Sequence, residues 1–134
     1  MMHAFRLRRG DDLLLSIRRY AEENGIRAAA IVSGVGCVTR AVIRDASGVT
    51  THEFSGRYEI VSITGTVSLA RTHLHIALAG EDMQVIGGHL CQGTLVNTTC
   101  EVVLLEMPGM EFSKEFDPET GYNELKISDY SFGQ

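Results

Sequence analysis

The sequence contains no run of about 20 apolar residues, the length that a membrane-spanning helix needs. Its start, MMHAFRLRRG, passes directly into a polar segment and lacks the apolar stretch of ~7–15 residues that marks a secretory signal. We therefore expect a protein that does not enter a membrane and has a cytoplasmic location.

Cysteine is scarce: the chain has three, Cys37, Cys91 and Cys100, with no CxxC spacing. An odd number of unclustered cysteines argues against a disulfide framework and favours a reducing compartment. Cysteine can also bind zinc, but these three lie in apolar segments with the character of strands. Because free cysteine packs like a small apolar residue, we expect buried or half-buried thiols.

Positive charge is in deficit. The 12 Lys and Arg residues are outnumbered by 17 Asp and Glu residues, which gives a net charge of −5 and a pI near 5.5. Binding to nucleic acid needs a basic patch that displaces counterions from the phosphates. The two basic clusters, one at Arg6, Arg8 and Arg9 and one at Arg18 and Arg19, are short and read as solvated faces. This balance argues against direct nucleic-acid binding.

The length and composition fit one globular domain. The chain has 134 residues, of which 44% are hydrophobic and 22% charged. Gly10, Asp11 and Asp12 open a helix in which an Asp is the N-cap, and Gly25 after Asn24 is a stop signal. Between these points apolar residues recur at helical spacing.

The rest of the chain has the character of strands. Gly34 and Gly36 inside one such segment predict a bulge or a close backbone approach. A polar tail follows Pro108, and we expect its last residues to be mobile. The expected strands are 3–9, 28–45, 49–54, 58–69, 72–79, 94–98, 101–107 and one near 123–127.

One N-terminal helix among about seven strands predicts an α+β fold, in which a mostly antiparallel sheet packs against the helix. We expect a compact single domain over residues 1–134, with a core at about 3–108 and a C-terminal extension at 109–134.

Three histidines are the best candidates for a functional site. Because side chains alternate across a strand, His73 and His75 point to the same face, with Cα atoms roughly 6.5–7 Å apart. That separation lets two imidazoles converge on one ion. His89 follows Gly87 and Gly88, which allow close backbone approach. Three neutral nitrogen donors with an open fourth position suit zinc or another borderline divalent ion.

A simpler interpretation exists for the same residues. A His-x-His on a strand is often an exposed polar face, or a hydrogen-bonded pair that supports a turn. Sequence alone does not bring His89 to the other two histidines. Glu59 and Glu101 lie in expected strands and could hydrogen-bond a ligating histidine or act as a base near metal-bound water. Each is also explained as a half-exposed or salt-bridged strand residue.

Four motifs in order resemble the plants and prokaryotes conserved (PPC) domain, also catalogued as domain of unknown function 296. The likeness runs from about residue 3 to residue 108. The motifs are Gly56-Arg57-Tyr58-Glu59-Ile60-Val61, Thr72-His73-Leu74-His75, Gly87-Gly88-His89-Leu90 with Gly93, and Thr99-Cys100-Glu101-Val102-Val103.

The resemblance implies a sheet with a helix packed on it, assembly as a homotrimer, and a bound metal, zinc, at His73, His75 and His89. It also implies that Gly56, Arg57, Tyr58, Glu59, Ile60 and Val61 form a segment that binds a protein partner. Plant members join this domain to AT-hooks that grip the DNA minor groove. This sequence has no Arg-Gly-Arg-Pro core and hence no AT-hook.

Three functions are compatible with the sequence. The first is a homotrimeric, metal-binding module that works by assembly or by binding a small molecule or a protein. The second is a zinc-dependent hydrolase or lyase, in which the metal lowers the pKa of a bound water toward ~7. The third is a DNA-binding or transcription-associated role inherited from the family, which the acidic balance disfavours.

Overall fold

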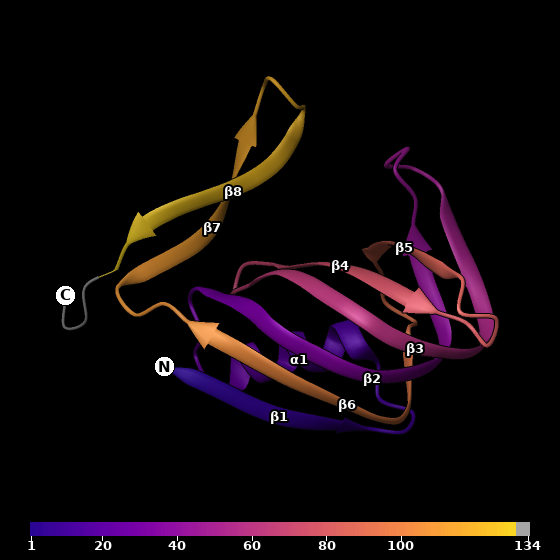
Figure 1. Cartoon of the computed structure of the whole chain (residues 1–134). Helices are drawn as coiled ribbons and strands as arrows, with labels where there is room; N and C mark the ends of the chain where they lie inside the picture. The colour runs from indigo at the N-terminus through magenta and orange to yellow at the C-terminus, as the bar shows by residue number, and fades with distance from the viewer. Residues whose placement is uncertain (131–134) are drawn as a thin grey trace.

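The computed structural model describes residues 1–130. The expected mobility of the last residues falls largely on 131–134, outside this range. Within the described range the chain forms one helix and eight strands (Figure 1): β1 (Met2–Arg8), α1 (Leu13–Glu23), β2 (Ala29–Arg44), β3 (Thr51–Val67), β4 (Thr72–Ala79), β5 (Val85–Leu90), β6 (Leu95–Glu106), β7 (Met110–Asp117) and β8 (Tyr122–Asp129).

Six strands form one sheet in the order β1-β6-β2-β3-β4-β5, and its neighbouring strands pair antiparallel. The end strand β5 also pairs with β2, through Ile43 opposite Leu90 and Arg44 opposite His89. The sheet is therefore strongly curled, and β5 lies between β4 and the end of β2. This confirms the expected architecture at the coarse level: a mostly antiparallel sheet with one short helix.

The helix begins and ends where the sequence predicts. Asp12 is the N-cap, and its Oδ1 accepts a hydrogen bond from the Leu15 N–H at 3.0 Å. Asn24 is the C-cap, and Gly25 follows with φ of 62°, a conformation that glycine adopts without strain. The apolar face of α1 packs against residues of the sheet in one continuous core. The residues of this face are Leu13, Leu14, Ile17 and Ala21.

Among residues 1–130, α1 is the one helix, and its 11 residues do not form a span of the length and apolar character that a membrane requires.

Two pairs of expected strands are single strands in the structure. Segments 49–54 and 58–69 join into β3, and 94–98 and 101–107 join into β6. Local irregularities explain the error: Gly56 has φ of 149° and Thr98 has φ of 56°. The pairing of β2 with β6 also shifts register, between Gly36 and Cys37 of β2. Bulges absorb such positions without ending a strand, and this shift confirms the irregularity predicted from Gly34 and Gly36.

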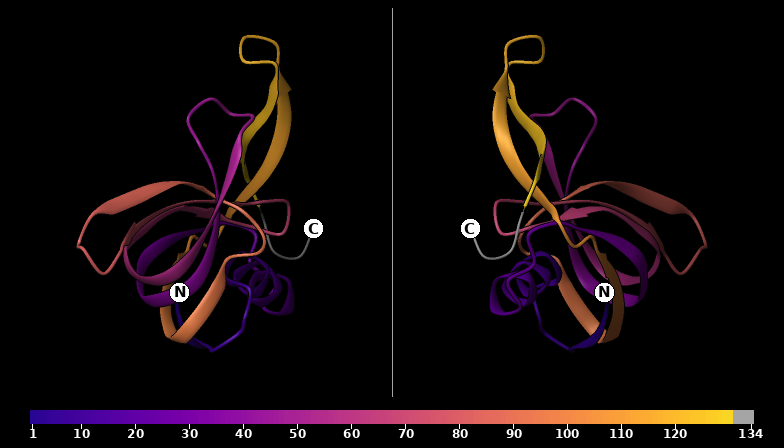
Figure 2. Two further views of the ribbon diagram at one scale, coloured as in Figure 1. Left: turned by 90° about the vertical axis from the view of Figure 1, so that its right-hand side faces the viewer. Right: turned by 90° about the vertical axis from the view of Figure 1, so that its left-hand side faces the viewer.

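The C-terminal extension is a second, two-stranded sheet. Sequence predicted one strand near 123–127, whereas β7 and β8 pair along their whole length, from Met110 opposite Asp129 to Asp117 opposite Tyr122. The hairpin rises from the same side of the molecule as the β2–β3 turn (Figure 2). Residues of both projections line a single cleft together with His73 and His89.

Candidate metal centre

The alternation of β4 presents two histidines on one face. Thr72, Leu74, Ile76 and Leu78 are buried, while His73 is half-buried and His75 exposed on the opposite face. The predicted orientation of the His-x-His pair is therefore confirmed. The two ring centroids lie 5.2 Å apart.

Pairing of β5 with β4 brings the third histidine to this face. His89 lies opposite His75 in the antiparallel register. Its ring centroid is 5.3 Å from that of His73 and 5.5 Å from that of His75. One nitrogen from each ring lies within 4.8 Å of the others. Segments that the sequence alone could not place together therefore meet at one point.

The two glycines before His89 allow β5 to fit between its neighbours. A Cβ on Gly87 would lie 2.3 Å from the carbonyl oxygen of Ile76 in β4. A Cβ on Gly88 would lie 2.7 Å from the carbonyl oxygen of Arg44 in β2. Any side chain at these positions would push β5 away from the sheet. The predicted close backbone approach is present, and it determines where the His89 ring lies.

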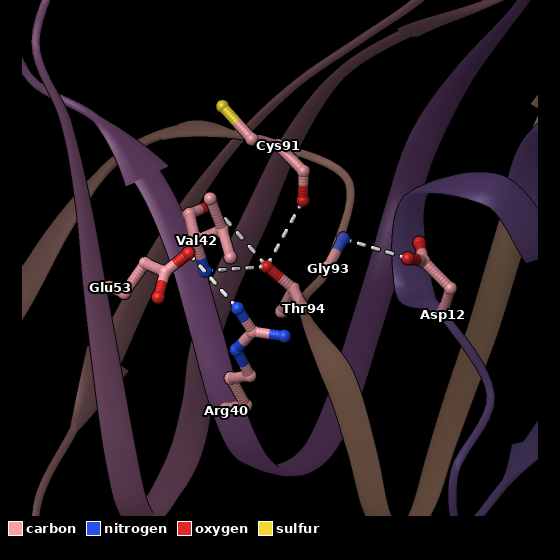
Figure 3. Close-up of polar contacts among 7 residues, drawn as sticks. All are labelled: Asp12, Arg40, Val42, Glu53, Cys91, Gly93 and Thr94. Carbon is pink, nitrogen blue, oxygen red and sulfur yellow. Dashed lines mark hydrogen bonds and ion pairs between the residues drawn. The ribbon is translucent and has the colours of Figure 1, made fainter.

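A buried hydroxyl and a carboxylate fix the chain just after β5 (Figure 3). Thr94 Oγ1 accepts the Val42 N–H at 3.0 Å, and its proton is within reach of the Cys91 and Val42 carbonyl oxygens, at 3.1 and 3.3 Å. Gly93 N–H donates to Asp12 Oδ2 at 2.8 Å. The same Asp12 carboxylate caps α1. The loop after His89 is thus tied to both β2 and the helix.

The surroundings keep two of the imidazoles neutral. Burial lowers the pKa of His89 to about 4, and the positive charge of Arg44 is the next cause. Burial also lowers the pKa of His73, followed by the charge of Arg71. A metal binds the neutral imidazole. Both rings are therefore in the ligating state at neutral pH.

The donor set fits a divalent ion. Nδ1 of His89 is buried and has no hydrogen-bond partner among residues 1–130, although a buried polar nitrogen normally has one. His73, His75 and His89 are also the only group of possible metal ligands found in the described part of the chain.

The cysteines are not part of this group. Cys100 is buried and Cys37 and Cys91 are half-buried free thiols, as expected. Burial raises the pKa of Cys100 to about 12, which keeps this thiol protonated and unsuited to zinc.

A cleft of about 840 Å³ opens beside the histidines, and His73 and His89 lie in its wall. Residues of α1, the β2–β3 turn, the β3–β4 turn and the β7–β8 hairpin form the remaining walls. Charged residues that sequence reasoning missed border this cleft: Arg44, Arg71, Lys114 and Glu124. Arg71 could have been found, since it precedes His73 by two residues. Arg44 could not, because its approach depends on the pairing of β2 with β5.

The two predicted carboxylates lie elsewhere. On β3, Glu59 is opposite Ala79, whereas Thr64 is opposite His75. Glu59 and Thr64 are five residues apart, which corresponds to about 16 Å along the strand at ~3.3 Å per residue. Glu101 lies on β6, which β2 and β3 separate from β4. The structure therefore does not bring either carboxylate to the histidines.

The segment Gly56–Val61 lies on β3, away from the histidine cluster. Arg57 and Val61 are exposed, and Ile60 is buried in the core. Tyr58 is half-buried and packs edge-on against Phe54, with ring centroids 6.4 Å apart. Much of the segment is therefore accessible to another molecule.

Known proteins share both sequence and fold with this chain. The bifunctional protein GlmU of Synechococcus sp. strain JA-2-3B'a(2-13) is 37% identical over 126 residues, which cover 94% of this chain and 20% of that protein. The chain thus spans about a fifth of the length of this relative.

Solved structures match more completely. A hypothetical protein from Salmonella cholerae-suis is 33% identical with a TM-score of 0.94, and the match covers 96% of this chain and 94% of that chain. A metal-containing protein from Archaeoglobus fulgidus is 34% identical with a TM-score of 0.80, over 94% and 93% of the two chains.

A family model provides the most direct assignment. It describes the Plants and Prokaryotes Conserved domain and matches residues 1–108, which leaves only the β7–β8 hairpin and the residues after it outside the match. This extent agrees with the likeness to the family that the motifs showed from about residue 3 to residue 108. The chain belongs to the Plants and Prokaryotes Conserved (PCC) domain family, the family that its four motifs predicted.

Proposed function

We propose that this chain is a homotrimeric binding module in which His73, His75 and His89 hold one divalent metal ion, with zinc the best-suited ion. The convergence of the three imidazole rings is the observation that carries the proposal. Three neutral nitrogen donors suit zinc. A bound zinc would supply an electrophilic centre with one position open to a ligand atom.

The similarity to known proteins supports the metal. The Archaeoglobus fulgidus protein described as metal-containing is 34% identical to this chain and shares its fold. The orphaned Nδ1 of His89 gives independent support, because a buried ring nitrogen without a partner is costly unless something binds it.

Exposed apolar residues support self-association. Val32, Val35, Val61 and Leu105 are exposed on strands of the large sheet. The β7–β8 hairpin also exposes apolar side chains, among them Phe116, Tyr122, Leu125 and Ile127. An isolated two-stranded hairpin is marginally stable in water, and exposed apolar patches often mark interfaces. Packing against further copies of the chain would bury these side chains, and a trimer is the assembly that the family resemblance implies.

The other two functions have less support. No feature of residues 1–130 favours the zinc-dependent hydrolase or lyase over a binding module. A role at DNA would require attraction to phosphates, which the net charge of −5 opposes for the chain as a whole. A protein or small-molecule partner is therefore the better fit, and Gly56–Val61 is the segment that we propose for a protein.

Metal content of a histidine variant tests the proposal. His89→Ala removes one ligand and should reduce bound metal, measured by elemental analysis after purification without a nickel column, from about one ion per chain to a small fraction of that. His52→Ala is the matched control, because His52 is exposed and pairs with Asp45 outside the cluster. Circular dichroism checks that both variants fold. Equal metal content in His89→Ala and the parent protein would refute the assignment.

A further inference from the structure

We propose that the cleft beside the three histidines binds a small organic anion, whose phosphate or carboxylate group is held by Arg44, Arg71 and Lys114. The inference deepens the proposed function and rests on it in one respect, because the anion would also supply an oxygen to the open position of the metal.

The cleft concentrates positive charge in an acidic protein. Four cationic residues border it, Arg18, Arg44, Arg71 and Lys114, against the single carboxylate of Glu124. The whole chain, by contrast, carries a net charge of −5. Like charges gathered in a cleft repel one another, and they also focus an attractive field on anions. An anion of small size would relieve this repulsion.

The hydrogen-bond donors in the cleft are largely free. None of the four cations forms an ion pair with a carboxylate among residues 1–130. Nε of Arg44 is buried and has no hydrogen-bond partner in the same range. Arg71 uses Nη1 to donate to the Asn123 carbonyl oxygen at 3.2 Å, which leaves the rest of its guanidinium available. Guanidinium groups match the oxygens of phosphate and carboxylate in a bidentate fork.

The position of the arginines links the anion to the metal. Arg44 lies opposite His89 in the pairing of β2 with β5. Arg71 precedes His73 by two residues on the chain. Lys114 approaches from the β7–β8 hairpin. An anion bound between them would thus lie next to the candidate metal ligands, and a cleft of about 840 Å³ has room for a small metabolite.

Calorimetric titration tests the inference. Inorganic phosphate and oxalate are titrated separately into the zinc-loaded and the metal-free protein at constant ionic strength, with neutral ethylene glycol as a blank. We expect binding of at least one anion and none of ethylene glycol. In the metal-free protein, where oxalate has no zinc to chelate, preference for phosphate or for oxalate shows which anionic group the cationic side chains favour.

Charge-neutralising variants locate the site. Arg44→Gln and Arg71→Gln should each raise the Kd of the anion about tenfold, as expected for loss of a charge-assisted hydrogen bond, and should retain zinc. Arg57→Gln, at an exposed arginine outside the cleft, should change the Kd less than about twofold. Lys114→Gln, at an exposed position of the hairpin, repeats the test without altering the large sheet.

The outcomes separate this inference from the proposed function. Zinc binding without anion binding, or an anion Kd that Arg44→Gln, Arg71→Gln and Lys114→Gln leave unchanged, would overturn the anion site alone. A protein that fails to bind zinc when zinc is supplied, but binds the anion in a way that depends on these cations, would support the anion site and refute the metal site.

Discussion

Thr94 shows how one buried side chain can determine the position of a residue in the candidate site. Its hydroxyl is fully enclosed and accepts the Val42 N–H while facing two carbonyl oxygens, those of Val42 and Cys91. Val42 lies two residues before Arg44, and Cys91 lies two residues after His89. The contact thus holds the ends of β2 and β5 together at the candidate site.

Thr94→Val should therefore lower the free energy of unfolding by about 1–3 kcal/mol, because valine has a similar shape but leaves the buried Val42 N–H without a partner. Denaturant unfolding measures the loss. Thr94→Ser keeps the hydroxyl and should lose less. A Thr94→Val variant as stable as the parent would show that this contact does not anchor the loop.

The sequence reveals those features of the candidate site that depend on neighbouring residues in the chain, and not those that depend on distant strand pairing. The shared face of His73 and His75 follows from the two-residue period of a strand, which is a local property. Arg44 reaches His89 only through a strand pairing between residues 45 positions apart in the chain. No local pattern encodes that pairing. The shared face of His73 and His75 was therefore predictable from local sequence, whereas the approach of His89 and Arg44 to it was not.

At the scale of elements, β5 is the strand on which the site depends most. It is short, it pairs with β4 on one side and β2 on the other, and it carries His89 at the meeting point. Gly88 is essential to this arrangement, since a Cβ there would lie 2.7 Å from the Arg44 carbonyl oxygen and 2.9 Å from Ile43 Cγ2.

Gly88→Ala should separate β5 from β2, lowering the free energy of unfolding by about 1–3 kcal/mol as in other overpacked sites, and should weaken zinc binding. Thermal unfolding and zinc titration measure the two effects. Gly80→Ala is the matched control, because its Cβ would lie 3.3 Å from the side-chain oxygen of Asp82 and 3.5 Å from the Tyr58 ring, with no backbone atom among its nearest neighbours. Unchanged zinc affinity in Gly88→Ala would contradict the role given to β5.

Elements were predicted well where local signals agree and poorly where they conflict. The Asp12 cap and Gly25 stop of α1 are local, and both were confirmed. Gly56 makes the backbone of β3 irregular, and Thr98 does the same in β6. Each strand nevertheless continues, because the adjacent strands pair with it on both sides of the irregular residue. Strand continuity is a property of the sheet and could not be read from either segment alone.

For the whole molecule, the distribution of charge matters more than its sum. The net charge of −5 disfavours binding along a nucleic-acid backbone, whereas four cations border one cleft beside three histidines. This distribution is the basis on which we propose a small anionic ligand rather than an extended polyanion. The exposed apolar side chains on the large sheet and on the β7–β8 hairpin are the surfaces that we propose for assembly.

We propose above all that three imidazoles of each chain hold one divalent ion. Native mass spectrometry of protein purified without a nickel column tests this most directly. We expect a species of about three times 14.7 kDa that carries one divalent ion per chain and loses it on chelation. A mass equal to the bare polypeptide, unchanged after incubation with zinc, would contradict the metal centre.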